Sequence, residues 1–208
     1  MSRRLRPLTA DGIAGLGTGC ADCSFWESGN HLEIRCGAEC DGELLRSRIS
    51  EVNREWGEYG RVAQEDEVVL GFIKYAPARY LPQARWLPSG AADPAAPLIA
   101  CLHVRDEVRC RGLDRVLLHA AMRDMHGRGE RWVYAYGRAA GNHVESPMPE
   151  LGFLLGQGFT VDRPHPEYPL LRLEIRSLAA WTENLEAALE SLLMPLGRAH
   201  RAPTPSPE

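Results

Sequence analysis

The sequence predicts an α/β (α+β) domain in which helices flank a mixed β-sheet. Apolar patterns typical of strand, helix, strand, short helix and further strands follow one another along the chain, and this order is characteristic of such folds. The length of 208 residues suits one domain with short attachments. Hydrophobic residues make up 44% and charged residues 25%, which are globular proportions.

The composition also excludes several classes of protein. No run approaches the ~18 apolar residues that a membrane-spanning helix needs, and the basic N-terminus is not followed by the apolar core of a signal peptide. We therefore expect a cytoplasmic protein with no membrane partner. The net charge of −4 does not favour nucleic-acid binding.

The first half of the chain is expected to contain one helix and two strands. Apolar residues at helical spacing predict a helix over 43–59, ended by glycines. The sequences VVLGFIKY and LIACLHV predict strands over 68–75 and 98–104, because β-branched and aromatic residues favour strands. Residues 76–97 are rich in Pro, Ala and Gly, and we expect a functional or mobile loop there.

The second half is expected to alternate helices and strands. A helix begins at Gly112, and glycines at 127 and 129 end it. Further elements are predicted in the following order: a strand over 132–136, a short helix over 149–156, strands from 159 and over 170–175, and an amphipathic helix over 178–193. That last helix could cover the sheet of its own chain or pair with a second copy in a homodimer.

Three regions are expected along the chain. Residues 1–42 are rich in Cys and Gly and show no lasting apolar periodicity. Residues 43–196 hold the predicted helices and strands. Residues 197–208 are polar and Pro-rich, and a disordered tail is expected there.

The turn between the strand over 98–104 and the following helix is the strongest local signal. Arg109, Cys110, Arg111 and Gly112 precede the helix, and the amides at a helix start attract anions. Gly lets the backbone approach a phosphate closely, and Arg matches phosphate oxygens. This turn could bind a pyrophosphate, or it could be an ordinary turn with a solvated Arg face.

Arg109, Gly112 and Asp114 stand in the frame of a motif formed by Arg or Gln, two residues, Gly, one residue, and Gly or Ala. With the flanking strands, the helix and the later FLLGQGF segment, the chain resembles the GCN5-related N-acetyltransferase (GNAT) superfamily over residues 20–193. Within it the chain is similar to an uncharacterised actinobacterial branch with a C-x-x-C-x-x-W-E start and an RPHP…LRLE segment. The resemblance implies a mostly antiparallel sheet with splayed central strands.

The resemblance also implies an activity. Acetyl-CoA or another acyl-CoA would lie between the strands ending at Val104 and Tyr136, and an amine of a small molecule or peptide would attack the thioester directly. A backbone amide near His103 would polarise the carbonyl. The donor-binding residues implied are Leu102, His103, Val104, Arg109, Cys110, Arg111, Gly112, Leu113 and Asp114. Asp114 departs from the motif, and its carboxylate would either turn outward to an Arg or oppose a phosphate.

The general acid is a second departure from the family pattern. A Tyr often stands four residues before the Gly of the Gly-Phe pair, and here that position is Leu154. Tyr136 and His103 are the preferred replacements, with Tyr134 also near, although a His on an apolar strand is more often packed than catalytic. His143, Glu145 and Glu150 are weaker candidates.

Four cysteines form a second candidate site. Cys20 and Cys23 are followed by Cys36 and Cys40, and two close pairs of thiolates can hold a structural zinc ion. Free buried thiols and disulfides are the alternatives, and disulfides are disfavoured in a reducing cytoplasm. His31 is a spare ligand. Trp86 and Tyr80 are the aromatic residues best placed for acceptor contact, with Trp26 and Trp56 less so.

Two other functions remain open from the sequence. The fold could use a different donor, such as an aminoacyl-tRNA or a carrier-protein thioester. It could also be a degenerate, non-catalytic binding module. Two departures from the family pattern favour these alternatives. Leu154 stands where the family often has Tyr, and Asp114 stands where the motif has Gly or Ala.

Overall fold

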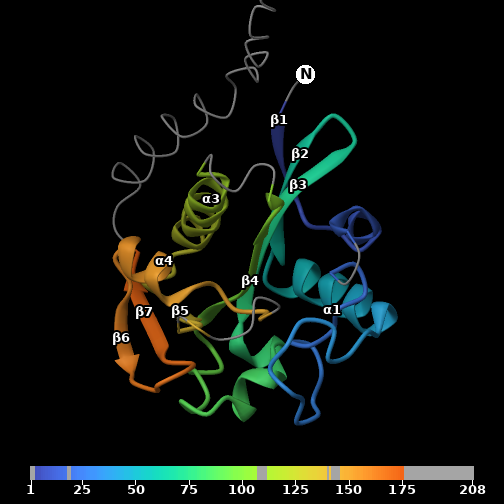
Figure 1. Cartoon of the computed structure of the whole chain (residues 1–208). Helices are drawn as coiled ribbons and strands as arrows, with labels where there is room; N and C mark the ends of the chain where they lie inside the picture. The colour runs from blue at the N-terminus through green and yellow to red at the C-terminus, as the bar shows by residue number, and fades with distance from the viewer. Residues whose placement is uncertain (1–2, 18–19, 107–111, 140, 142–145, 176–208) are drawn as a thin grey trace, which may run out of the picture.

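The computed structural model describes residues 3–17, 20–106, 112–139, 141 and 146–175. A seven-stranded sheet in the order β1-β2-β3-β4-β5-β7-β6 forms its centre, and helices flank it (Figure 1). Neighbouring strands are antiparallel except for the parallel pair β4–β5. The strands are β1 (Arg3–Pro7), β2 (Gly60–Glu65), β3 (Val68–Pro77), β4 (Pro97–Val104), β5 (Trp132–Tyr136), β6 (Thr160–Arg163) and β7 (Leu170–Glu174).

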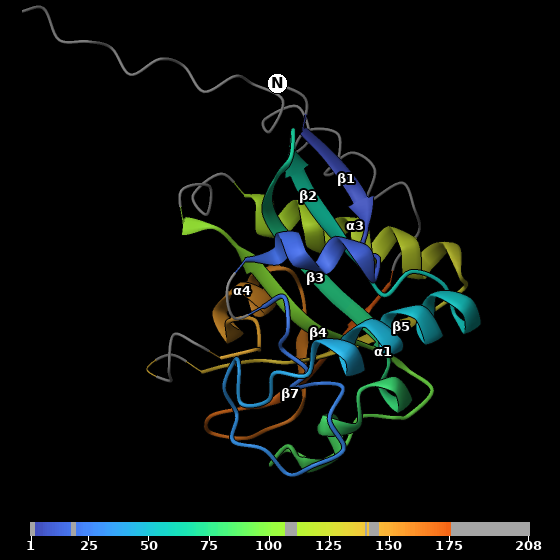
Figure 2. The ribbon, with the colours of Figure 1, turned by 90° about the vertical axis from the view of Figure 1, so that its right-hand side faces the viewer.

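Helices cover both faces of this sheet. One face carries α1 (Gly42–Glu55) together with the N-terminal segment, and the other carries α3 (Leu113–Gly127) and α4 (Leu151–Gly156), as the two ribbon views agree (Figures 1 and 2). Three short 3-10 turns complete the described elements: η1 (Asp11–Leu16), η2 (Ala78–Tyr80) and η3 (Pro82–Trp86). The fold class predicted from the sequence is confirmed.

The sheet separates two hydrophobic cores. On β3, Phe72 and Ala76 face the core under α1, while Ile73 and Tyr75 face the core under α3. This is the two-residue alternation of a strand that is buried on both sides. The buried apolar face of α1, formed by Leu45, Ile49 and Val52, and that of α3 are therefore both needed to cover β3.

The alternation on β4 is interrupted once. Lys74 of β3 pairs with Cys101 and Tyr75 pairs with Ile99, so Ala100 is an extra residue, a β-bulge. As a result both Ala100 and Cys101 belong to the core on the α1 side. Beyond the bulge, Leu102 packs on the α3 side, and His103 stacks on Phe72 on the α1 side.

The expected elements form with small differences in length. The helix expected over 43–59 ends at Glu55, and Asp41 caps its start by accepting the N–H groups of Glu43 and Leu44. Strands β1 and β2 were not expected. The segment over 76–97, for which we expected a functional or mobile loop, is not structureless: η2 and η3 lie in it, and Leu81, Ala84, Leu87 and Ala92 are in the core.

Several expectations lie outside the described residues. These are the helix over 178–193 with its possible dimer contact, and the tail over 197–208. Within the residues that the structure does describe, none of the helices combines the length and apolar character required to span a membrane.

Candidate active site

Strands β4 and β5 part shortly after they meet. Their parallel ladder holds only the pairs Leu98–Tyr134 and Ile99–Ala135. The bulge at Ala100 follows directly, and bulges bend a strand away from its neighbour. The end of β4, from Leu102 to Val104, therefore remains bonded to β3 but lies beyond the β5 ladder.

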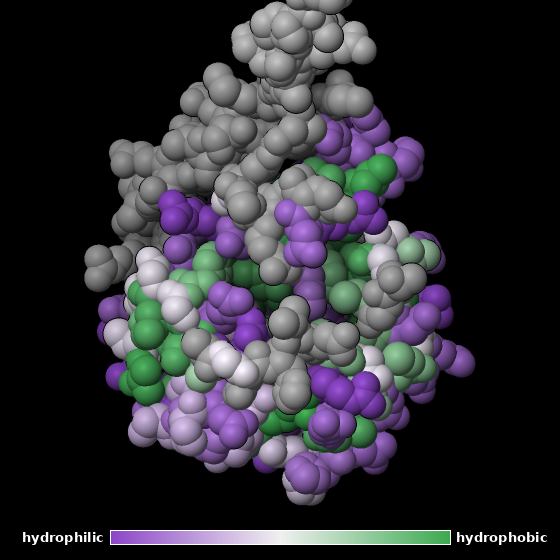
Figure 3. All heavy atoms as spheres, viewed as in Figure 1, coloured by the Kyte–Doolittle hydropathy of each residue, from purple (hydrophilic) through white to green (hydrophobic). Residues whose placement is uncertain are grey.

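A cavity of about 290 Å³ lies at this point. The surface is hollowed near the centre of the face drawn in Figure 3, with hydrophobic and hydrophilic residues around the hollow. Its walls come from the end of β4, the start of α3, and the segment that leads into α4. The lining residues are Leu102, His103, Val104, Asp114, Arg138, Ser146, Met148, Pro149, Glu150 and Phe153.

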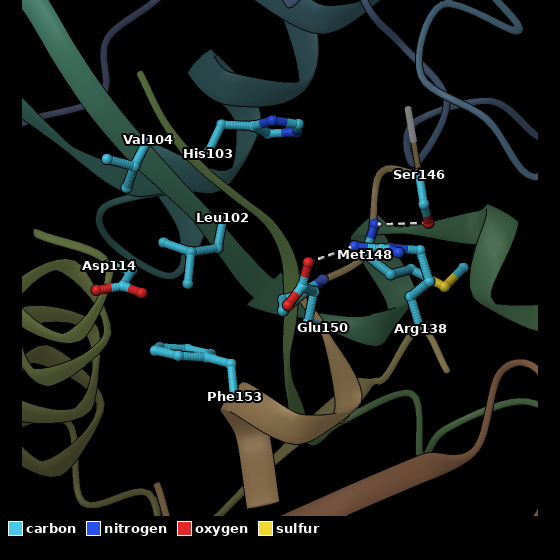
Figure 4. Close-up of a pocket in the computed structure, with 10 residues that line it drawn as sticks. Leu102, His103, Val104, Asp114, Arg138, Ser146, Met148, Glu150 and Phe153 are labelled. Atoms are coloured by element: carbon cyan, nitrogen blue, oxygen red, sulfur yellow. Dashed lines mark hydrogen bonds and ion pairs between the residues drawn. The ribbon is translucent and has the colours of Figure 1, made fainter. Parts of the chain in front are cut away.

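The two sides of β4 give the cavity two different walls. In Figure 4, Leu102 points toward Asp114 and Phe153, whereas the His103 ring points away from them. The first wall lies on the α3 side of the sheet and the second on the α1 side. The expected donor-binding residues Leu102, His103 and Val104 thus line one cavity, together with Asp114.

The start of α3 has the backbone geometry of an anion site but also carries a carboxylate. Gly112 is left-handed, with φ 73°, which favours Gly at this position. Leu113, expected to contribute an amide to the donor site, has a side chain buried in the core. Asp114 Oδ1 accepts the backbone N–H of Arg115 at 2.8 Å, so the carboxylate lies over the first turn. It lines the cavity instead of turning away from it.

His103 is held between Phe72 and the N-terminal segment. Its ring stacks on Phe72 with 5.2 Å between centroids and 24° between planes. Its Nε2 lies 3.8 Å from the Cys36 Sγ. His103 is half-buried, so it is both fixed and open to the cavity that it lines.

The expectation of a catalytic role for Tyr136 does not fit the geometry. Tyr136 is fully buried and is not among the residues that line the cavity. Its hydroxyl donates to the Gly90 carbonyl at 2.7 Å and accepts the Ala92 N–H at 3.1 Å. Burial raises the pKa of Tyr136 to about 12. The hydroxyl therefore holds residues 84–92 against β5, which is a structural task.

The remaining polar lining comes from the segment before α4. Arg138 pairs with Glu150 at 2.8 Å, and Ser146 Oγ accepts the Met148 N–H at 3.3 Å (Figure 4). Leu154, at the position where the family often has Tyr, is fully buried in the α3-side core. Arg138, Ser146, Met148 and Phe153 were missed by sequence reasoning, since no spacing connects them to β4.

The four cysteines expected to bind zinc are not brought together as a set of metal ligands. Among the described residues no three His, Cys, Asp or Glu side chains gather as metal ligands. The thiols have different neighbours: Cys23 Sγ accepts the Gly37 N–H at 3.4 Å, Cys40 Sγ contacts the Gly37 carbonyl at 3.7 Å, and Cys36 faces His103. Cys20 is half-buried, and burial raises its pKa. The spare ligand His31 lies against Trp86 instead.

The aromatic residues proposed for acceptor contact divide by exposure. Trp26 is fully buried against Tyr136, Trp56 lies under the Arg128 guanidinium, and Tyr80 is buried with its hydroxyl on Glu55. Trp86 is 46% exposed, and its Nε1 donates to the Gly29 carbonyl at 3.2 Å. Arg109, Cys110, Arg111, His143 and Glu145 lie outside the described residues.

The sequence matches no family model and no curated protein. Solved structures are similar in fold. One is the PaiA N-acetyltransferase of Thermoplasma acidophilum in complex with coenzyme A, with a TM-score of 0.56 and 17% identity over 84% of this chain and 99% of that one. Another is YncA, a putative acetyltransferase of Salmonella typhimurium with acetyl-CoA, with a TM-score of 0.56 and 15% identity over 85% and 96%. A third is a putative GNAT-family acetyltransferase of Desulfovibrio desulfuricans, with a TM-score of 0.50 and 16% identity over 84% and 100%.

Proposed function

We propose that this chain, which has the fold of the GCN5-related N-acetyltransferases, transfers an acyl group from a coenzyme A thioester to an amine. The observation that supports this most is the cavity at the point where β4 and β5 part. It joins an open strand edge, a helix start and a half-buried imidazole within one hollow. These are the parts that thioester binding and acyl transfer require.

The open edge of β4 supports donor binding. Main-chain groups of residues 102–104 lie beyond the β5 ladder, and an extended amide chain can pair with such an edge. The pantetheine arm of coenzyme A is a chain of this kind. Phe153 and Leu102 supply apolar surface on the α3 side of the cavity. Gly112 precedes α3 in a left-handed conformation and offers no side-chain cap, so the helix start could still bind an anion through amides other than that of Arg115.

His103 is the group that we assign to proton transfer. A neutral imidazole can take the proton of an attacking amine near neutral pH. In the proposed reaction the amine nitrogen attacks the thioester carbonyl carbon directly, and the departing thiolate of coenzyme A takes up a proton. Amides near His103 would stabilise the charge that develops on the carbonyl oxygen.

Asp114 favours a second candidate, in which the fold binds a donor other than coenzyme A. Its carboxylate occupies the first turn of α3 at the cavity, where a pyrophosphate would be repelled. An aminoacyl-tRNA or a carrier-protein thioester would then supply the acyl group. A site that binds no donor, in a purely structural binding module, is the remaining alternative.

Calorimetric titration with acetyl-CoA separates these candidates. The proposal expects a dissociation constant in the micromolar range, and continued turnover, with many equivalents of free coenzyme A released per chain, only when an amine is added. Primary amines of small molecules and of peptide N-termini should be compared as acceptors. Absence of binding at millimolar acetyl-CoA would contradict the proposal and favour the alternative donors or a binding module.

A further inference from the structure

We propose that Cys36 is a second acyl acceptor of this site, and that it becomes S-acylated by the bound donor when no amine is present. The inference rests on the proposed function, because it needs a thioester in the cavity. It adds a modification site on the chain itself. The observation behind it is the contact of 3.8 Å between the Cys36 Sγ and the Nε2 of His103.

The N-terminal segment brings Cys36 to β4. An isolated antiparallel bridge between Cys23 and Cys40 closes the stretch between them into a loop. The Gly37 N–H donates to the Cys23 sulfur, and Ser28 Oγ donates to Glu39 at 2.8 Å. This segment lies on the same side of the sheet as α1 (Figure 2). Cys36 itself is half-buried, so its sulfur is neither sealed in the core nor fully in solvent.

His103 connects the thiol to the cavity. It lines the cavity, and Figure 4 shows its ring turned away from Leu102 and Phe153. The stack on Phe72 fixes the plane of that ring. A thiol in contact with a held imidazole is the arrangement that activates cysteine nucleophiles, because the thiolate is the attacking species.

The other described cysteines lack this arrangement. Cys101 and Cys23 are buried, and burial raises the pKa of Cys101 well above its usual value. Burial also raises the pKa of Cys20. Cys40 is exposed, and its sulfur contacts the Gly37 carbonyl. Among the described cysteines, Cys36 therefore combines access with an imidazole neighbour.

The chemical step is balanced without any further reactant. His103 takes the proton of the Cys36 thiol, and the sulfur attacks the carbonyl carbon of the thioester. The bond from that carbon to the sulfur of coenzyme A breaks, and the departing thiolate takes the proton back from the imidazolium. The products are acyl-Cys36 and free coenzyme A. One thioester replaces another, so an excess of free coenzyme A reverses the step.

Intact-mass spectrometry of the full chain tests the proposal. Incubation with acetyl-CoA, without an amine, is expected to add one acetyl group that maps to Cys36 and is removed by free coenzyme A. Cys36→Ser and Cys36→Ala should lose this modification, and the exposed Cys40→Ser should keep it. His103→Gln should slow acylation by about 100-fold, the effect of losing a general base. Unchanged acetyl-CoA affinity in the cysteine variants, and an unchanged urea midpoint in His103→Gln, show that each variant still folds.

p-Nitrophenyl acetate separates this proposal from the proposed function, because this activated ester does not need a coenzyme A site. A burst of one equivalent of p-nitrophenolate that is lost in Cys36→Ser supports the nucleophile, even if acetyl-CoA does not bind and the proposed donor fails. If acetyl-CoA binds and amines are acetylated while Cys36 stays unmodified by both reagents, the proposal is overturned and the proposed function stands.

Discussion

Asp114 brings a negative charge to the first turn of α3, at a place where the peptide dipoles already attract anions. Its Oδ1 accepts the Arg115 N–H, so one of the amides that could bind an anion at this helix start is already bonded within the chain. A donor phosphate must displace or approach this carboxylate. If the proposed donor binds here, the Asp114 carboxylate is expected to weaken its affinity.

Replacing Asp114 with Asn is expected to tighten acetyl-CoA binding about fivefold, because one charge at a helix start is worth about 1 kcal/mol. Calorimetric titration measures the change. Asp93→Asn is a matched control: Asp93 is exposed, is not among the cavity-lining residues, and likewise accepts a backbone N–H, from Ala95 at 2.9 Å. Weaker binding in Asp114→Asn would show that the carboxylate assists the donor.

Tyr136 is a residue for which the sequence suggests a catalytic role, but in the structure it is buried and its hydroxyl bonds to backbone groups. Tyr136→Phe is expected to reduce the free energy of unfolding by about 1–3 kcal/mol, because buried backbone groups at Gly90 and Ala92 lose their partner. The turnover number should change little, whereas loss of a general acid would cost at least about 100-fold. Urea denaturation and steady-state rates check both, with Tyr134→Phe as the control.

The pH dependence of Tyr136 has a definite sign. Its pKa is about 12 in the folded chain, against about 10 in an unfolded one. The unfolded chain therefore loses the proton first, so the stability contributed by Tyr136 is complete below pH 10 and falls as the pH rises toward 12. Tyr136→Phe should show a shallower fall in unfolding free energy over this window. An identical slope in both proteins would contradict the assignment.

At the level of elements, the sequence predicts those with strong apolar patterns and misses those without. The strand over 132–136 has the predicted bounds, since WVYAY is apolar throughout. β1, with the sequence RRLRP, and β2, with GRVAQE, are mostly polar. β2 forms because β3 offers it a partner edge, and β1 forms because β2 in turn offers it one. Such tertiary pairing overrides local propensity.

The bulge in β4 is likewise not predicted by the sequence pattern. Strict alternation along LIACLHV would put Leu98, Ala100, Leu102 and Val104 on one face. The extra residue at Ala100 reverses the second half, so that Leu102 and His103 exchange sides. The sequence could thus predict which strand carries the site, but not that His103 would meet the N-terminal segment.

Gly71 of β3 allows a close approach of the β3 backbone to the end of β4. A Cβ at this position would lie 2.7 Å from the His103 carbonyl oxygen. Gly71→Ala is therefore expected to lower the urea midpoint and to weaken acetyl-CoA binding, because the end of β4 must shift. Gly152→Ala, in α4 with nothing within 4 Å of the added carbon, should instead stabilise slightly, by about 0.5–1 kcal/mol. Equal effects from the two changes would argue against strand separation as the cause.

On the scale of the whole molecule, the N-terminal segment shares the core of the sheet. Leu8, Ile13, Phe25 and Trp26 are fully or almost fully buried in it. Glu27 pairs with Lys74 of β3 at 2.8 Å, and Tyr59 donates to the same carboxylate oxygen. Burial would lower the pKa of Lys74, but the Glu27 carboxylate, together with Cys101 and Cys23, holds that pKa above its usual value. The region boundaries at 42/43 and 196/197 stay predictions.

Hydrogen exchange followed by mass spectrometry tests whether residues 3–42 unfold with the sheet. Peptides that cover 23–28 are expected to show the same free energy of opening as peptides from β3 and β4, because they share one core. If the N-terminal segment unfolds independently, its peptides would show a smaller free energy of opening than the peptides of β3 and β4. Such a result would support the division near residue 42.

The parting of β4 from β5 leaves the end of β4 with two sides that meet different stretches of the chain. Leu102 and Asp114 line the cavity on the α3 side, and Cys36 of the N-terminal segment contacts His103 on the other. Substitutions near the N-terminus can therefore alter what meets His103 without touching the residues around Leu102 and Asp114. Selection can therefore vary the N-terminal segment, which carries the proposed nucleophile Cys36, while it preserves the residues on the α3 side of the cavity.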